Sequence, residues 1–333
     1  MSPAATGPTT GPNGHPTGRL DDIEVSATVA KVLGSWPSAG LAVGIVRDDS
    51  LAWFHGYGLA DTAAKTPIAE DTVFRIGSIT KTFTAIAVMQ LWEQGLVDLD
   101  APANDYLRAF RLVPVKADVR PPTVRHLLTH TAGLGYWRRL SDLLRPGVGS
   151  GVRAGRSGAA PLARYYRRGL PVEVEPGTKW MYSNHGFATL GQIVEDVSGQ
   201  PLDRYLREHI FEPMGMEHTD LIRSDRVRPQ LATGYTLNSR GLRPVDDREV
   251  LAVGGGAAYS TLADLARFVT VLSEGLPAGT HRCFSRRRWR SCSIPTSRRT
   301  LGCRGWAWGS SVVTRTVTAP WVTMASCRAS FRS

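Results

Sequence analysis

The first part of the chain alternates between helical and strand-like spacing of its hydrophobic residues. From Asp21 to Trp36 the apolar residues recur at near-helical spacing and Gly34 follows the last of them, which predicts a helix. Residues 41–47 and 51–58 are short apolar and aromatic runs separated by Asp48-Asp49-Ser50, a pattern typical of a β-hairpin. Residues 72–76 predict one more short extended segment before the pattern turns helical.

The next helix is apolar on nearly every face. From Ile79 onward almost no polar face remains before Gln94, and Gly95 predicts its end. Beyond it the pattern predicts helices over 104–110, over 124–128, from 187 to 199, after Pro201, and after the capping box Thr261-x-x-Asp264. The Gly/Arg-rich residues 146–158 have no pattern and predict a mobile loop.

Length and composition indicate a globular protein. With 333 residues and 42% hydrophobic content, the chain can bury a substantial core. The Pro/Gly/Thr-rich residues 1–20 predict a disordered arm, and they lack the apolar region of a secretory signal, which favours the cytoplasm. No apolar run reaches membrane-spanning length, so we expect no membrane partner. We predict one domain over 21–280, with a helical part at about residues 85–250.

The net charge of +11 is located in one segment. Residues 281–333 contain 11 Arg and no acidic residue, whereas residues 1–280 have 29 basic and 29 acidic residues. This tail has no aromatic or helical register of a nucleic-acid-binding segment, so we expect no nucleic-acid partner. All four Cys also fall there, so residues 1–280 contain no disulfide framework and no metal site of Cys type.

Ser78 and Lys81 are the first candidates for chemistry. Residues three apart lie on the same side of a helix, so the hydroxyl and the amine can come within hydrogen-bond reach. A serine is a weak nucleophile until a base takes its proton, and an amine acts as that base once burial lowers its pKa. The alternative is that Ser78 caps the helix and Lys81 extends along the surface, because Ser-x-x-Lys alone is a weak signal.

Tyr182 and Asn184 are the second pair, in a turn before the helix that begins near Phe187. A tyrosine next to a buried lysine can carry a proton to a leaving group, and an amide can hold the lysine and bind a substrate carbonyl. The alternative is that Tyr182 only packs and Asn184 caps the following helix.

Two further patterns give weaker signals. His126 and His130 stand four apart, but the intervening Leu127-Leu128-Thr129 lacks the glutamate of a metalloprotease helix and favours a packed helix end. Gly254-Gly255-Gly256 lacks the lysine and spacing of a phosphate loop. We therefore predict no metal site and no cofactor.

Together these stretches resemble the serine β-lactamase and penicillin-recognising family, in the branch of class C β-lactamases, D-specific peptidases and related esterases. Ser78-Ile79-Thr80-Lys81 matches the first motif of the family, and Tyr182-Ser183-Asn184 matches its Tyr-x-Asn motif. The segments from His126 to Leu134 and from Gly254 to Thr261 also resemble this branch, over roughly residues 21–280.

The resemblance implies a β-lactamase/transpeptidase-like α/β (α+β) fold, with an antiparallel sheet flanked by helices plus a helical region. It implies that Ser78 is acylated, that Lys81 and Tyr182 transfer protons, and that Asn184 binds the substrate and Lys81. The implied function is a serine hydrolase acting through an acyl-enzyme on a small-molecule ester, β-lactam or D-amino-acid peptide. The oligomeric state stays open.

The tail departs from this family. The third motif, Lys-Thr-Gly or His-x-Gly on a central strand, does not occur after residue 280. The alternative function is therefore a non-catalytic or truncated protein of the same fold. We predict that residues 281–333 are translated out of frame: read two bases later, Trp321 with Val322 and Met324 with Ala325 each encode Gly, and permitted codons between them give Gly-His-Asp-Gly.

Overall fold

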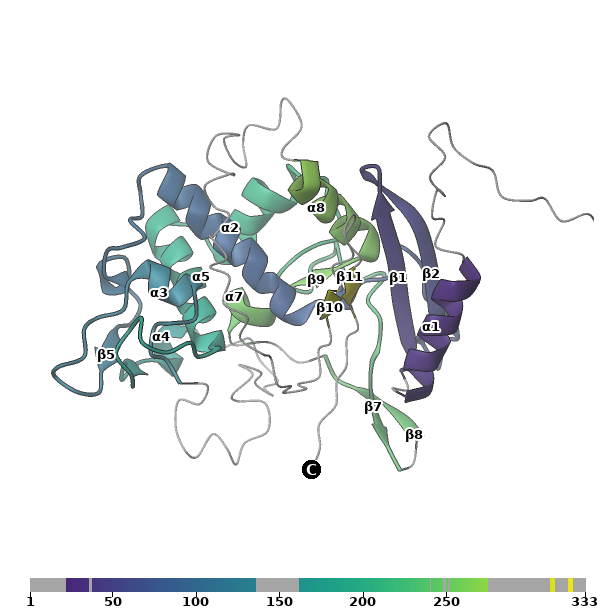
Figure 1. Ribbon diagram of the computed structural model, residues 1–333, viewed down its shortest axis with the longest axis horizontal. Coiled ribbons are helices and arrows are strands. Elements are labelled where there is room, and N and C mark those ends of the chain that lie inside the picture. Colours follow the sequence, from purple (N-terminus) through teal and green to yellow (C-terminus); the bar gives the residue numbers. More distant parts are fainter. Residues whose placement is uncertain are drawn as a thin grey trace, which may run out of the picture. The chain divides into compact units, whose positions relative to one another are not determined.

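The computed structural model describes residues 22–35, 38–135, 162–239, 241–247, 250, 252–274, 312–314 and 323–325. The chain divides into two units, Met1–Ser38 and Ala39–Ser333. In the first unit, helix α1 spans Asp22–Ser35, which confirms the helix predicted there (Figure 1). The predicted arm over residues 1–20 and the loop over 146–158 lie outside the described residues.

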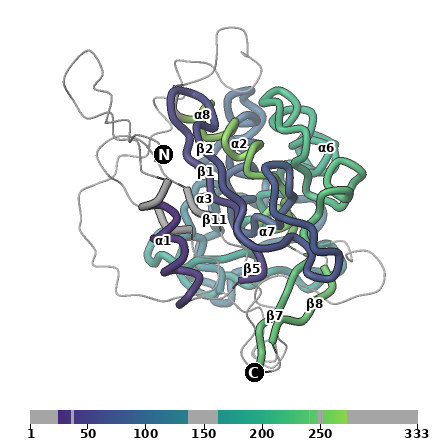
Figure 2. Tube along the Cα trace, turned by 90° about the vertical axis from the view of Figure 1, so that its right-hand side faces the viewer, coloured from purple at the N-terminus to yellow at the C-terminus, as the bar shows by residue number. Residues whose placement is uncertain are grey.

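The second unit begins with the predicted hairpin. Strand β1 (Gly40–Arg47) pairs antiparallel with β2 (Ser50–Asp61), and β3 (Thr66–Pro67) pairs with the far end of β2. The turn between β1 and β2 places Asp48 and Asp49 at φ of 47° and 61°, a left-handed conformation that Asp tolerates better than most residues. The backbone of β11 (Thr323–Ala325) lies next to β1, so strands from both ends of the chain meet there. Figure 2 shows the hairpin of β1 and β2 from another side.

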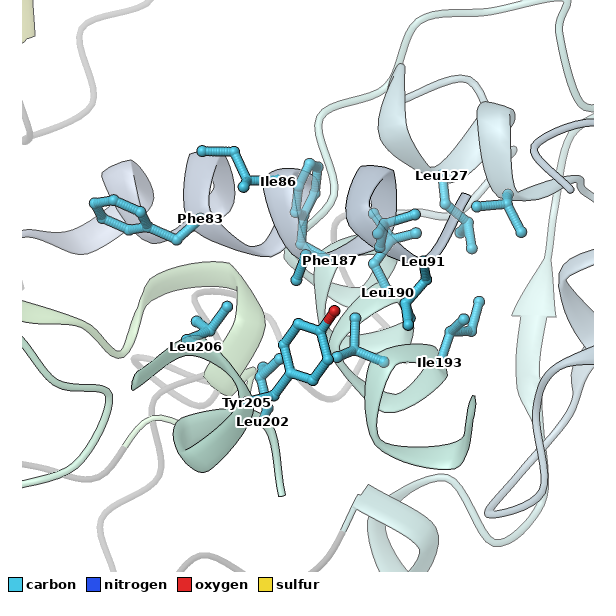
Figure 3. Packing of buried hydrophobic residues seen from close by; sticks show 14 of the residues in the cluster. Phe83, Ile86, Leu91, Leu127, Phe187, Leu190, Ile193, Leu202, Tyr205 and Leu206 are labelled. Atoms are coloured by element: carbon cyan, nitrogen blue, oxygen red, sulfur yellow. The ribbon is translucent and has the colours of Figure 1, made fainter. Parts of the chain in front are cut away.

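Helix α2 (Thr80–Glu93) is the centre of the helical region. Its apolar residues are buried on most of its circumference, as the sequence predicts, because α5 (Asn184–Ser198), α6 (Leu202–Leu206) and the π-helical turn η4 (Arg207–Phe211) pack against it. Figure 3 shows side chains of this core. The Phe83 ring lies 5.1 Å from the ring of Phe211 and 4.7 Å from that of Phe268 on α8 (Leu262–Glu274).

The remaining helices and strands of the second unit are short. They are β4 (Phe74–Arg75), η1 (Gly77–Ile79), η2 (Ala103–Asp105), β5 (Leu112–Pro114), α3 (Val124–Leu128), α4 (Leu162–Tyr165), β6 (Leu170–Val172), β7 (Gly234–Asn238), β8 (Gly241–Val245), α7 (Val253–Gly256), β9 (Tyr259–Ser260) and β10 (Val312–Thr314). β4 pairs with β9, β7 with β8 and β10 with β11, all antiparallel, whereas β5 and β6 are parallel.

One predicted helix is wrong. Residues 104–110 form only the short turn η2, because their backbone groups bond elsewhere. The Asn104 side chain accepts from the Leu112 N–H and donates to its carbonyl, and the N–H groups of Arg108 and Ala109 donate to the Asp196 carboxylate on α5. Side-chain hydrogen bonds to the backbone compete with helix formation in this way.

Candidate active site

Ser78 lies in a tight turn between a strand and a helix. Gly77, at φ of 53°, provides a left-handed turn after β4, and Ser78 follows on η1 before α2 begins. The Thr80 hydroxyl donates to the Gly77 carbonyl at 2.6 Å and accepts from the Ala258 N–H at 3.0 Å, which fixes the turn against the chain just before β9. Ser78 itself is exposed and is therefore within reach of a ligand.

Lys81 lies beneath Ser78 in the first turn of α2 and is only 7% exposed. Its Nζ lies 3.1 Å from Ser78 Oγ and 2.7 Å from Asn184 Oδ1, and it also donates to the Gly255 carbonyl. Burial lowers the pKa of Lys81 to about 7, because water no longer solvates the ammonium. Lys81 therefore does not extend along the surface.

The hydrogen-bond partners of Lys81 determine which of its protonation states can act as a base. Asn184 Oδ1 and the Gly255 carbonyl can only accept hydrogen bonds, so a neutral amine uses its two N–H groups on them. The amine lone pair is then left for the proton of the Ser78 hydroxyl. An ammonium has no lone pair, so only the neutral form of Lys81 can take that proton.

Tyr182 contacts Ser78 from the other side. Its phenol oxygen is 2.6 Å from Ser78 Oγ, and its ring centroid is 4.8 Å from Lys81 Nζ. Burial raises the pKa of Tyr182, and the hydrogen bond to Ser78 opposes this shift. The phenol therefore keeps its proton at neutral pH and can pass it to a partner oxygen or nitrogen.

Asn184 is the first residue of α5, whereas the sequence placed it in the preceding loop. The N-cap of α5 is Ser183, whose hydroxyl accepts from the Gly186 N–H at 3.3 Å. The alternative role of Asn184 as a helix cap is therefore wrong. Its side chain is left to accept from Lys81, because its neighbour satisfies the helix end.

The three glycines 254–256 lie in α7 and allow it to approach α2 and α5 closely. A Cβ on Gly254 would lie 2.6 Å from the Phe187 carbonyl oxygen and 3.2 Å from Thr84 Oγ1. This close contact brings the Gly255 carbonyl to Lys81. The sequence did not assign Gly255 to the site, although the run of glycines was a signal of close backbone approach.

Gly254→Ala is expected to lower the free energy of unfolding by about 1–3 kcal/mol, because the added methyl group overpacks the contact between α7 and α5. Gly256→Ala is the matched control, since its Cβ would meet nothing closer than 3.9 Å. Urea unfolding of both variants measures the difference. Equal free energies of unfolding for the two variants would show that α7 does not need this close approach.

The two histidines of the 126–134 segment, His126 and His130, contact different neighbours. His126 Nδ1 accepts from the Thr123 N–H at 3.2 Å and completes a capping box at the start of α3. The ring of His130 lies 4.7 Å from the ring of Tyr182, a neighbour that the sequence did not reveal. Among the described residues, no group of three or more His, Cys, Asp or Glu could hold a metal ion.

The predicted cap at the start of α8 is present. The Asp264 N–H donates to Thr261 Oγ1 at 3.0 Å, which confirms the cap of α8, while the Asp264 carboxylate accepts from Thr219 and the His218 N–H.

None of the helices described here is both long enough and apolar enough to cross a membrane.

Comparison with known proteins shows which family the chain belongs to. Residues 26–323 match the sequence profile of the Beta-lactamase family. The chain belongs to the Beta-lactamase family. The match extends past residue 280, where the motif resemblance ends, and it includes the segments of Ser78, Tyr182 and Asn184.

Members of the Beta-lactamase family similar to this chain have several names. Esterase EstB of Burkholderia gladioli is 38% identical over 198 residues, covering 56% of this chain and 48% of the esterase. A Beta-lactamase of Yersinia enterocolitica is 29% identical over 273 residues, covering 79% of this chain and 64% of that enzyme. The chain thus spans about half to two thirds of the length of these curated relatives.

Solved structures confirm the predicted fold class. The octameric penicillin-binding protein homologue from Pyrococcus abyssi superimposes with a TM-score of 0.64 at 28% identity, covering 76% of this chain and 56% of that chain. The mixture of helices with antiparallel strand pairs is therefore the β-lactamase/transpeptidase-like arrangement that the sequence predicted.

Proposed function

We propose that this chain is a serine hydrolase in which Ser78 forms an acyl-enzyme with a small-molecule ester, β-lactam or D-amino-acid peptide. The single observation that carries the proposal is the set of contacts on Ser78 Oγ: Lys81 Nζ at 3.1 Å and Tyr182 Oη at 2.6 Å. An exposed hydroxyl within hydrogen-bond reach of an amine whose pKa is near neutral can be activated as a nucleophile. The protonated phenol beside it can supply a proton to the leaving group.

The two groups divide the proton transfers by their pKa values. Lys81, with a pKa of about 7, is partly neutral at pH 7 and takes the Ser78 proton as the oxygen attacks the acyl carbon. Tyr182, whose pKa is raised, donates its proton to the leaving oxygen or nitrogen and regains one from the Lys81 ammonium. Asn184 holds the amine in place, and its NH₂ group can donate to the substrate carbonyl.

The proposed chemistry predicts that acylation speeds up with rising pH through about 7. Below this pKa Lys81 is an ammonium and cannot accept a proton, while above it the amine can. Second-order rate constants for labelling by a fluorophosphonate, measured from about pH 5 to about pH 9, should follow one ionisation near the pKa of Lys81. A rate that stays constant across this range would contradict Lys81 as the base.

Hydrolysis of a substrate panel tests the proposal. Short acyl esters, a chromogenic cephalosporin and D-Ala peptides represent the three classes, and each is offered to the wild-type protein and to Ser78→Ala. We expect turnover of at least one class by the wild type and none by the variant. Equal turnover by the variant would contradict Ser78 as the nucleophile.

A second candidate function has an observation in its favour. After residue 280 the sequence contains neither Lys-Thr-Gly nor His-x-Gly, and strands β10 and β11 also lack such a triplet. By the family resemblance, this motif lines the site and supplies half of the oxyanion hole through a backbone N–H. A family protein without it would bind ligands but acylate slowly. Folded wild-type protein that turns over none of the panel would support this alternative.

A further inference from the structure

His130 holds the backbone on both sides of Tyr182. Its carbonyl oxygen accepts from the Met181 N–H at 2.7 Å, and its ring Nδ1 accepts from the Ser183 N–H at 3.2 Å. In an extended chain the N–H groups of residues two apart point to the same side, so a single residue can bind both. The N–H groups of the two residues on either side of Tyr182 are therefore held by one neighbour.

His130 has a left-handed backbone conformation. It follows α3 at φ of 58°, in the left-handed region that is uncommon for residues other than Gly and in which Asn, Asp and His are enriched. In this backbone conformation, the carbonyl and the ring of His130 both contact the segment around Tyr182. The imidazole also packs against the phenol ring in a tilted arrangement, with a centroid distance of 4.7 Å and an angle of 34° between the ring planes.

The hydrogen bond from Ser183 requires a neutral imidazole. A nitrogen accepts a hydrogen bond only when it carries no proton, so Nδ1 must be free of one and Nε2 must carry it. Burial, together with the smaller effect of the positive charge of Lys81, lowers the pKa of His130 to about 4. The ring is therefore neutral at the pH where Lys81 becomes an amine.

We propose that His130 is a positioning residue for the proposed reaction: it fixes the Tyr182 phenol against Ser78 Oγ by binding the two flanking peptide N–H groups and packing against the ring. This inference rests on the proposed function, since it gives His130 its role through Tyr182. His130 does not touch the reacting atoms itself. It acts by holding the residue that does.

Two substitutions separate the acceptor from the ring. His130→Asn keeps an acceptor at the position of Nδ1 and suits the left-handed backbone, whereas His130→Phe keeps an aromatic ring and removes the acceptor. We expect His130→Phe to slow fluorophosphonate labelling at least about tenfold, because small displacements of a catalytic group have large effects on rate. His130→Asn should recover most of this loss.

A double-mutant cycle with Tyr182→Phe distinguishes positioning from a general structural effect. If His130 acts through the phenol, His130→Phe should cause almost no further loss of labelling rate in the Tyr182→Phe background. His55→Phe is the matched control, because His55 lies 4.4 Å from the Tyr57 ring on β2, and it should leave labelling unchanged. The same fractional loss in both backgrounds would overturn the inference.

A measurement without turnover separates this inference from the proposed function. In protein labelled with ¹³C-tyrosine, the resonance missing from Tyr182→Phe identifies Tyr182. We expect that resonance to move in His130→Phe, to stay near its wild-type position in His130→Asn, and to be unaffected in His55→Phe. An unmoved Tyr182 resonance in His130→Phe would overturn the inference, even if the fluorophosphonate never reacted with the protein. A moved resonance in a protein that does not react with the fluorophosphonate would contradict the proposed function alone.

Discussion

Lys81→Ala is expected to slow acylation of Ser78 by about three orders of magnitude, within the range known for loss of a general base. The reason is local: the structure places no second amine on Ser78 Oγ among the described residues, and the phenol of Tyr182 has a raised pKa and holds its proton. The measurement is the pseudo-first-order rate of labelling by a fluorophosphonate at a pH above the pKa of Lys81.

Lys65→Ala is the matched control for this variant. Lys65 stands three residues after Thr62, the same spacing as Ser78 and Lys81, but it is exposed. The Lys65→Ala variant should react with the fluorophosphonate at the wild-type rate. If Lys81→Ala labelled as fast as Lys65→Ala while remaining folded by circular dichroism, another group would be activating Ser78 and the mechanism would be wrong.

The second large effect concerns the tail. We propose that the domain covers residues 21–280 plus strands that the alternative reading frame encodes, and that residues 281–333 as written lack the third motif. A chain that carries the alternative frame after codon 280 is expected to acylate about 10²–10³-fold faster, because one donor of an oxyanion hole contributes roughly 3 kcal/mol to transition-state stabilisation.

The DNA sequence near codon 280 is the decisive control for this prediction. The alternative frame must stay open past the codons of Trp321 to Ser330 and encode His-x-Gly there. A stop codon before them, or a different triplet, would show that the tail is a divergent end of the family sequence. The family match, which runs to residue 323, does not distinguish these cases, because it does not read codons.

The sequence predicted most of the local structure around the site. The apolar circumference of α2, the glycine after it and the short extended segment before it are all local signals, so the neighbourhood of Ser78 and Lys81 could be derived from residues close in sequence. The separation between Lys81 and Asn184 along the chain is large, so only a resemblance to a family, and not spacing, joined them before the structure did.

The remainder could not be predicted because it depends on tertiary contacts. Residues 104–110 have helical spacing, but Asp196 from a distant helix binds their N–H groups. The role of the Gly255 carbonyl depends on how closely α7 approaches α5, and the position of His130 depends on a left-handed turn. A glycine in the sequence indicates that a backbone can approach closely or turn there, but not which distant backbone group it meets.

Mapping the site of covalent labelling tests the central claim most directly. After incubation with a fluorophosphonate, the folded wild-type protein should gain one adduct by intact mass, and fragmentation of the proteolytic peptide should place it on Ser78. Ser78→Ala, shown to be folded by its thermal unfolding, should gain none. An adduct on another residue, an adduct formed equally fast in Ser78→Ala, or folded wild-type protein that gains no adduct would contradict the account.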